Sequence, residues 1–362
     1  MKTFIGNGTG ATQSATEQAL QGLTSPSAII FMAPYEAMEE AAGIIRNRFP
    51  SIPSIGTIGT KFHNGIVGDK NIVVLGFFED AKVSCGVMEH IDLYPAESIS
   101  KVEKSIAEIA PGKDNSICVE FCTCAEEKLV TTLSLALRSK GLPMIGGSAF
   151  GAPDGKSSIV AYNGRIYENA CVYAMIKNTT GRIRVYKENI YSIANEEPHY
   201  ATKVDTKRKA LIQIDNRPAA DVYSEVLHVR RENIVDNVMQ NPIGRIVGDQ
   251  VFISSMKELG SNGELVNFKQ INRNDCIYFL KRDDYDQIER ETRSQIQSDA
   301  SRISLVLSVD CIYRYLLYQQ EHYLDTYRKD MAALGNWVGV VTGGEQFNNQ
   351  HVNQTMVCAI FE

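Results

Sequence analysis

The sequence predicts a mixed α/β protein made of two tandem lobes, each a mixed sheet built from strand–helix–strand units and hairpins. Apolar runs of strand length alternate with stretches of helical periodicity through the first half of the chain. An Asn-Gly pair at Asn163 lies between alternating apolar and polar residues, which is typical of a β-hairpin. A polar stretch at 177–203 separates two halves that are each long enough for one domain. We therefore expect lobes at 1–180 and 195–362.

Composition restricts the class of protein. The 362 residues include 37 Lys and Arg against 43 Asp and Glu, a net charge of −6 that argues against non-specific nucleic-acid binding. The hydrophobic fraction of 44% is enough for a folded core. No apolar run approaches the roughly 18 residues of a membrane span, and the N-terminus does not resemble a signal peptide. We expect a soluble, cytoplasmic protein without nucleic-acid or membrane partners, whose eight scattered cysteines are reduced thiols.

The elements of the first half follow in order along the chain. A short strand at 3–5 precedes a helix at 13–21, a buried strand at 27–32 and a helix that ends at Phe49-Pro50. Residues 65–78 resemble two paired strands around a turn at 69–71, and 81–87 continues that sheet. The half then predicts a helix at 97–109, a strand at 117–121, a helix at 126–140, the hairpin at 160–167 and a closing strand at 170–176.

The second half begins with a strand at 211–214 and a helix at 219–229. A strand at 251–254 is expected to pair with 264–268 across the Gly-rich turn 260–263, followed by a strand at 276–280 and a charged helix at 283–298. An apolar strand at 302–309 leads into a helix at 312–333 that Gly335 terminates. Strands at 337–341 and 355–361 complete the chain.

The two halves share a pattern of a strand, a helix, a strand ending in two glycines, a loop and a closing strand. A duplicated unit and chance similarity of ordinary α/β elements both explain this pattern. Ligands in α/β proteins lie beyond the carboxyl ends of strands, near helix N-termini. A duplication would therefore place a site around these strand-end residues: Gly147, Ser148, Cys311, Arg314, Gly344 and Glu345.

Nucleophiles are present without the partners that catalysis needs. Cys122 and Cys124 precede a helix, where a thiol can become reactive, but the favoured interpretation is that they are buried structural cysteines. Ser148 lacks the second glycine of a nucleophile elbow. The six histidines show no metal-binding spacing, and a single histidine as a haem ligand stays open. A cysteine or serine hydrolase is thus an alternative without an identifiable catalytic base.

A polar cluster near the C-terminus is the strongest candidate for a site. Its hydrogen-bonding side chains follow two glycines: Glu345, Gln346, His351, Asn353, Gln354 and Thr355. Such a cluster is typical of a pocket for a small polar ligand. The alternative is a loop whose side chains satisfy local backbone groups.

Several motifs together resemble the FIST family of sensory domains. The run from Gly344 through Thr355 resembles the closing motif of these domains, and 310–314 (DCIYR) is similar to the family's Cys-x-x-Arg strand end. Residues 216–223 (NRPAADVY) resemble the opening of the FIST C-terminal part, and Gly147 with 162–164 (YNG) matches the end of the N-terminal part. The resemblance covers nearly the whole chain.

The resemblance implies a non-enzymatic sensor without a cofactor, resembling a stand-alone bacterial module or the sensory part of a longer protein. It implies a small, amino-acid-like ligand and a separate signalling partner such as a histidine kinase, a chemoreceptor or a cyclic-dinucleotide enzyme. Arg314 would pair with a ligand carboxylate and Glu345 with an amine, while Asn353 and Thr355 would fix orientation. Some members bind haem and respond to nitric oxide, which makes a haem-based sensor the first alternative.

Overall fold

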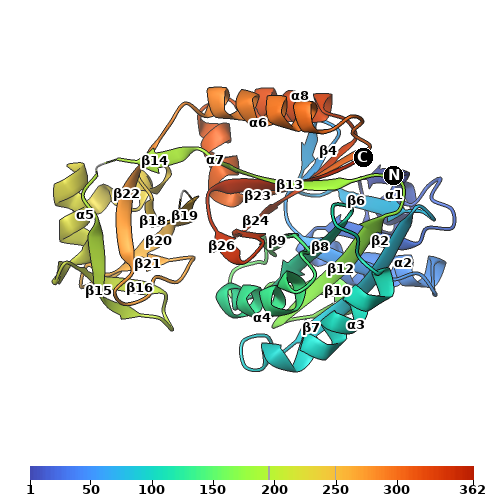
Figure 1. The fold of residues 1–362 in the computed structure, drawn as a ribbon, viewed down its shortest axis with the longest axis horizontal. Coiled ribbons are helices and arrows are strands. Elements are labelled where there is room, and N and C mark those ends of the chain that lie inside the picture. The colour runs from blue at the N-terminus through green and yellow to red at the C-terminus, as the bar shows by residue number, and fades with distance from the viewer. Residues whose placement is uncertain (195, 249) are drawn as a thin grey trace.

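A computed structural model describes residues 1–194, 196–248 and 250–362 (Figure 1). It confirms the mixed α/β class. The chain forms a large body, residues 1–190 and 283–362, and a smaller inserted domain, residues 191–282, at one end of the body. The two termini meet on the body, where the Met1 amino group donates a 2.6 Å hydrogen bond to the Glu362 carbonyl. No helix in the described ranges is both long and apolar enough to cross a membrane.

The described part of the body contains three mixed sheets with helices on their outer faces. The first sheet has the order β1 (Thr3–Gly8), β6 (Ile72–Phe77), β2 (Ala28–Ala33), β3 (Ser54–Ile58), β10 (Val160–Tyr162), β11 (Arg165–Tyr167). The second has the order β26 (Gln350–Val352), β25 (Glu345–Phe347), β9 (Met144–Ser148), β8 (Ser116–Cys122), β12 (Ala170–Asn178), β7 (Ala81–Glu89). The third has the order β13 (Ile183–Asn189), β27 (Thr355–Phe361), β23 (Leu305–Cys311), β24 (Trp337–Thr342), β4 (Lys61–His63), β5 (Ile66–Gly68). The helices of the body are α1 (Thr12–Ala19), α2 (Met38–Arg48), α3 (Ile99–Ile109), α4 (Glu126–Arg138), α6 (Tyr285–Asp299), α7 (Ile312–Gln320) and α8 (Leu324–Ala333).

The three sheets are copies of one unit. In each unit a strand, a helical segment and a parallel strand follow one another: β2-α2-β3, β8-α4-β9 and β23-α7-α8-β24. A hairpin comes next, and then an antiparallel strand returns beside the first strand of the unit. The hairpins are exchanged in a cycle: β4-β5 joins β24, β10-β11 joins β3, and β25-β26 joins β9. The repeat is thus real, but it is a triplication and not a duplication.

One asparagine anchors each exchanged hairpin in the same way. Asn64, Asn163 and Asn348 occupy the hairpin turns with φ of 44°, 48° and 55°, a left-handed conformation that asparagine tolerates. Each Oδ1 accepts a hydrogen bond from the first residue of the neighbouring unit's strand: Trp337 N at 2.8 Å, Ser54 N at 2.9 Å and Met144 N at 3.2 Å. The backbone N–H of each asparagine donates back to the carbonyl of that same residue. Because all three contacts join different units, the sheets cannot be separated into two lobes at 1–180 and 195–362.

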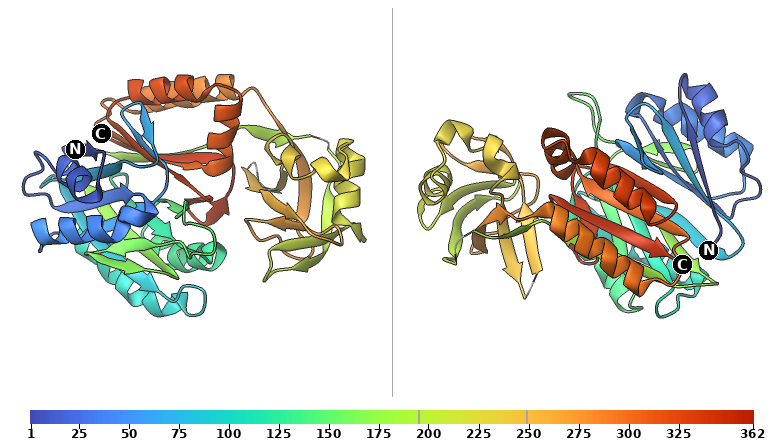
Figure 2. Two further views of the ribbon diagram at one scale, coloured as in Figure 1. Left: turned by 180° about the vertical axis from the view of Figure 1, so that it is seen from behind. Right: turned by 90° about the horizontal axis from the view of Figure 1, so that it is seen from above.

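The inner faces of the three sheets share one apolar core. Alternate residues of β8 point to opposite faces of its sheet. Val119 and Phe121 join the central core, while Cys118 and Cys122 face α3 and α4. The outer face of the third sheet is covered by α6, α7 and α8, which pack around Trp337 (Figure 2). Period-two alternation thus gives each strand two apolar faces, one for each layer.

The inserted domain has its own sheet and its own core. Its elements are β14 (Tyr191–Ile193), β15 (His199–Asp205), β16 (Ala210–Ile214), β17 (Arg217–Pro218), α5 (Ala219–Leu227), β18 (Ile243–Val247), β19 (Gln250–Ser254), β20 (Met256–Leu259), β21 (Leu265–Asn267) and β22 (Cys276–Arg282). Short 3-10 turns are found at 231–233 and 236–239 in this domain, and at 35–37 and 95–98 in the body. The chain enters through β14 and leaves through β22, and these two strands pair as a two-stranded ribbon. The predicted polar boundary at 177–203 contains three strands, β13, β14 and β15, and the inserted domain begins within it, at Tyr191.

Several predicted pairings are also wrong. β5 pairs with β4 through a turn at Asn64-Gly65, and β6 pairs with β1 and β2 in a different sheet. β7 does not continue that sheet but pairs with β12. β19 pairs with β18, while β20 pairs with β21 across 260–263. The helix predicted at 312–333 is broken into α7 and α8 at His322, whose φ is +54°.

Candidate functional site

The body and the inserted domain meet at a polar contact that we call the seam. Hydrogen bonds cross it from Gln270 N to Glu127 Oε1 at 2.7 Å, from Ser255 N to Asn353 Oδ1 at 3.1 Å, and from Tyr313 Oη to the Met256 carbonyl at 2.8 Å. Gln354 Nε2 also donates to Ser255 Oγ at 2.8 Å. Apolar contacts cross the boundary as well, since Ile253 and Leu280 of the inserted domain pack in one cluster with Leu317 and Tyr318 of the body.

An ion pair lies at the centre of the seam. Lys209, in the turn between β15 and β16, places its Nζ 2.9 Å from Glu126 Oε2 and 3.3 Å from Glu127 Oε2. Both carboxylates stand in the first turn of α4, where the helix dipole favours negative charge. Burial alone would raise the pKa of Glu126, but Lys209 and His351 outweigh it and lower the pKa to about 2. Burial would likewise lower the pKa of Lys209, but the two glutamates raise it above its ordinary value.

Neutral polar side chains continue this cluster into the body. Ser148, the last residue of β9, donates from Oγ to Glu126 Oε1 at 3.1 Å. Gln346 Nε2 lies 3.2 Å from Ser148 Oγ and 3.1 Å from His351 Nδ1. Burial lowers the pKa of His351, so its imidazole is neutral near pH 7. The exchanged hairpin β25-β26 therefore brings its polar residues to the carboxyl end of β9.

A pocket of about 520 Å³ opens beside the ion pair. Its lining carries four cationic side chains and two carboxylates, and the remaining residues are neutral. The lining residues are Glu126, Lys207, Arg208, Lys209, Lys257, Glu258, Val266, Asn267 and Phe268. A pocket of this size and polarity suits a small charged metabolite.

Some of the buried polar atoms that have no hydrogen-bond partner lie at the seam. Among the described residues, such atoms include Gln346 Oε1, Gln354 Oε1, Ser254 Oγ, Lys269 Nζ and Arg245 Nε. Native proteins leave few buried polar atoms unsatisfied, so each of these atoms indicates a place where water or a ligand could bind. Donors and acceptors are both represented, which favours a ligand with both kinds of group.

The C-terminal residues predicted as a site lie together, on the body side of the seam. Glu345 Oε2 accepts hydrogen bonds from Thr355 Oγ1 at 2.7 Å and from Thr355 N at 3.1 Å. Burial raises the pKa of Glu345 well above its ordinary value, and the buried Cys311 thiol is its neighbour. Through these two hydrogen bonds, Glu345 holds the start of β27 in place.

The glycines predicted at the site have packing roles. A Cβ on Gly147 would lie 2.5 Å from Thr342 Cγ2, and one on Gly344 would lie 2.5 Å from His351 Cε1. The Gly344 carbonyl also accepts a hydrogen bond from Ser148 N at 2.9 Å. Both glycines therefore allow the close approach of segments that build the seam.

Arg314 lies in a different cluster from the seam. Its guanidinium is 1% exposed and forms ion pairs with Glu188 and, at 2.9 Å, with Glu289. The rings of Tyr318 and Tyr327 lie 5.0 and 5.6 Å from it. Protein carboxylates thus occupy the place that the sequence analysis assigned to a ligand carboxylate.

The geometry gives little support to the two alternatives, a cysteine or serine hydrolase and a haem-based sensor. Burial raises the pKa values of the Cys122 and Cys311 thiols well above the ordinary value and also raises the pKa of Cys124, so none is an activated thiolate. Ser148 contacts Glu126, a weak base, and not the imidazole of His351. In the five pockets that we compared within the described residues, no histidine or cysteine contributes to the lining, so these pockets do not fit a haem.

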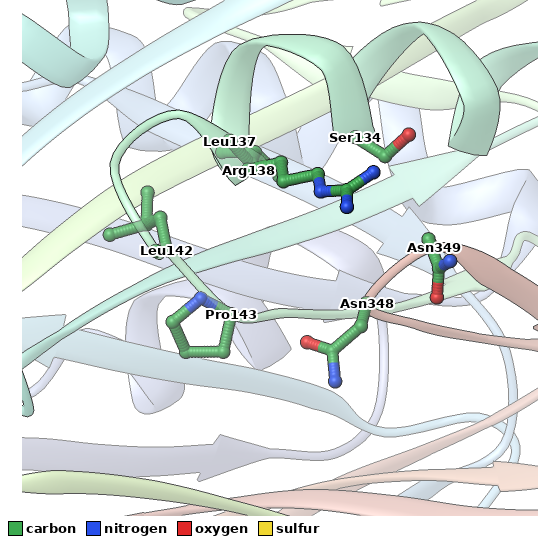
Figure 3. Close-up of a pocket in the computed structure, with 8 residues that line it drawn as sticks. Ser134, Leu137, Arg138, Leu142, Pro143, Asn348 and Asn349 are labelled. Carbon is green, nitrogen blue, oxygen red and sulfur yellow. The ribbon is translucent and has the colours of Figure 1, made fainter.

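A second pocket, of about 500 Å³, lies between the end of α4 and the turn that joins β25 to β26 (Figure 3). Its wall combines apolar Leu137, Leu142 and Pro143 with one charged side chain, Arg138. The Asn348 side chain at its edge already anchors the hairpin. This pocket lies at the start of β9, away from Ser148 at the strand's other end, and offers fewer polar groups than the seam.

Sequence reasoning missed the side chains that the inserted domain contributes. Lys209 and Lys269 lie in polar connections whose partners are distant in the chain, and Lys209 is 83 positions from Glu126. The basic run Lys207-Arg208-Lys209 was the available signal. It indicates a positively charged turn but not what faces that turn.

Comparison with known proteins agrees with the resemblance. The FIST N domain model matches residues 27–217, and the FIST C domain model matches residues 219–348. No curated protein matches the chain. Among solved structures, phosphoribosylformylglycinamidine synthase II from Thermotoga maritima shares 10% identity over 99% of this chain and 71% of that chain, with a TM-score of 0.19. FIST domains are generally sensory, non-catalytic domains that bind small ligands in signal transduction. Since the two matched ranges together cover most of the chain, the protein belongs to the FIST family.

Proposed function

We propose that this chain binds a small polar metabolite at the seam and transmits its presence to a separate signalling partner. The observation that carries the proposal is the pocket of about 520 Å³ whose wall contains the Lys209–Glu126 ion pair. The two residues come from different structural units. A ligand that contacts either of them therefore acts directly on the contact between those units.

The chemistry of the seam suits a ligand with charged ends. An anionic group would approach Lys209, and a ligand amine would approach Glu126 and Glu127. Ser148 and Gln346 supply neutral hydrogen-bonding groups behind the ion pair. Lys209 replaces Arg314 as the proposed contact of a ligand carboxylate. Gln346 and Ser148 remain proposed ligand contacts, as the sequence predicted.

Transmission would use the connection between the two units. The inserted domain is attached through the β14-β22 ribbon, in which Tyr191 pairs with Arg282. Tyr191 and Leu280 of this ribbon are buried in a cluster with Leu317 and Tyr318 of the body, so a change in the orientation of the inserted domain would repack these side chains. A ligand that binds one orientation of the inserted domain more tightly than another shifts the population toward the tighter-binding orientation. The free energy of this shift cannot exceed the difference in binding free energy between the two orientations. A histidine kinase, a chemoreceptor or a cyclic-dinucleotide enzyme would read this orientation. No cofactor and no chemical step are required.

Binding measurements on matched variants test this function. A panel of amino acids and organic acids would be screened by thermal shift, and the hits measured by calorimetry. We expect Lys209→Met to weaken binding of a hit at least tenfold, because it removes the cation facing the pocket. The control Lys203→Met, an exposed lysine on β15, should bind like the wild type. Equal affinity in Lys209→Met and the wild type would exclude the seam as the site.

A further inference from the structure

One lysine at the seam is buried without a counter-charge in contact. Lys269 is 2% exposed, and its Nζ has no hydrogen-bond partner among the described residues. It lies between Phe268, whose carbonyl accepts from Lys209, and Gln270, whose N–H donates to Glu127. The nearest aromatic group is Phe252, with the ring centroid 5.3 Å from Nζ. A buried ammonium without an anion is costly, so its retention calls for an explanation.

The surroundings of Lys269 add positive charge. Arg245 and Lys187 disfavour its ammonium form, whereas Glu127 and Asp275 favour it. Lys187 lies over the same Phe252 ring at 4.6 Å and lines another pocket, of about 260 Å³. Arg245 bonds Asp275 through its Nη1 at 3.3 Å, and its buried Nε has no partner among the described residues. Glu264 pairs with Arg208 beside the larger pocket. With the lining of that pocket, and apart from Lys187, the seam holds six basic side chains against five acidic ones.

We propose that the ligand of the seam is an oxyanion with a net negative charge, such as a dicarboxylate or a phosphate compound, and that Lys269 is its buried counter-charge. This inference rests on the proposed function and narrows it, because a zwitterionic amino acid carries no net charge. The buried Lys269 ammonium, which has no partner among the described residues, is balanced by a ligand of this kind and not by a neutral one. The unpartnered Arg245 Nε–H adds a donor suited to an oxyanion.

Burial and the neighbouring cations lower the pKa of Lys269 to about 7. Near neutral pH its ammonium and neutral forms are thus close in free energy, and a bound anion would favour the ammonium. Binding of the anion should therefore take up protons above pH 7. Calorimetry in two buffers of different ionisation enthalpy measures this uptake.

The test compares the wild-type chain with Lys269→Met, using Lys203→Met as the exposed control. The probes are succinate and pyrophosphate as polyanions, acetate as a monoanion and alanine as a zwitterion, in a buffer without phosphate. We expect a polyanion to raise the melting temperature of the wild type and of Lys203→Met. In Lys269→Met its dissociation constant should rise at least tenfold, and the proton uptake should disappear. Without ligand, Lys269→Met should melt at the same or a higher temperature than the wild type, which a purely structural lysine would not do.

The outcomes separate this inference from the proposed function. If Lys269→Met binds a polyanion as tightly as the wild type does, the inference is overturned. It is also overturned if alanine binds in a way that depends on Lys209 while neither polyanion binds. Both results leave the seam as a ligand site. A lower melting temperature of ligand-free Lys269→Met, with no polyanion binding to the wild type, would also overturn it. Binding of every probe unaffected by Lys209→Met would refute the proposed function instead.

Discussion

Replacing Arg314 by methionine tests whether this residue holds the fold or the ligand. The substitution leaves the Glu188 and Glu289 carboxylates, which are 3% and 1% exposed, without their shared cation. Removing one partner of a buried ion pair costs about 3–5 kcal/mol. We therefore expect Arg314→Met to lower the free energy of unfolding by about that amount. Denaturant unfolding followed by circular dichroism measures the change.

Two further variants sharpen this test. Arg290→Ala removes an exposed pair with Asp286 and should cost less than about 1 kcal/mol. Adding Glu188→Gln and Glu289→Gln to Arg314→Met removes the stranded charges and should restore part of the lost stability. An Arg314→Met variant as stable as the wild type that no longer binds a ligand would refute this reasoning and return Arg314 to the site.

Three other changes have defined outcomes. Burial raises the pKa of Glu120 to about 8, so the folded state binds its proton more tightly than the unfolded state, and this carboxyl lowers stability as the pH rises from about 4.5 to 8. Glu120→Gln should remove that decline, worth up to about 5 kcal/mol at pH 8, in denaturant unfolding at several pH values; an unchanged pH profile would contradict it. Asn163→Ala loses the anchor to Ser54 and a favourable left-handed residue, and should cost about 1–2 kcal/mol by thermal unfolding; a cost below 0.5 kcal/mol would contradict the shared role of the hairpin asparagines. Gly344→Ala places a Cβ against His351 and should cost about 1–3 kcal/mol and weaken ligand binding, measured by unfolding and calorimetry; wild-type values of both would show that the segments are not in close contact.

Local patterns in the sequence predicted elements better than pairings. The hairpin at 160–167 was predictable because Asn163-Gly164 supplies the turn by itself. The strands at 65–78 were predictable as strands, but β5 and β6 belong to different sheets because tertiary contacts choose the partner. The first copy of the repeat is less visible in the sequence because its second strand, β3, ends at Ile58-Gly59 and not in two glycines, and because it has one more residue between Asn64 and Ile72 than its equivalents have.

The candidate site was predictable on the body side only. Gln346 and Ser148 come together because an exchanged hairpin joins β9, and both were visible as polar residues near glycines. Lys209 and Lys269 could not be assigned, because their positions depend on how the inserted domain lies against α4. Arg314 had the right chemistry for a carboxylate, but burial gave it carboxylates of the protein itself.

Hydrogen exchange with and without a bound metabolite tests the central claim, that the seam is the ligand site, most directly. The probe would be the best hit of the thermal-shift panel, added at saturation to the wild-type chain. We predict slower exchange at 207–209, at 267–270 and in the first turn of α4, with the core of the third sheet unchanged. Protection confined to 138–143 and 348–349, around the pocket of Figure 3, with unchanged exchange at the seam would contradict the account.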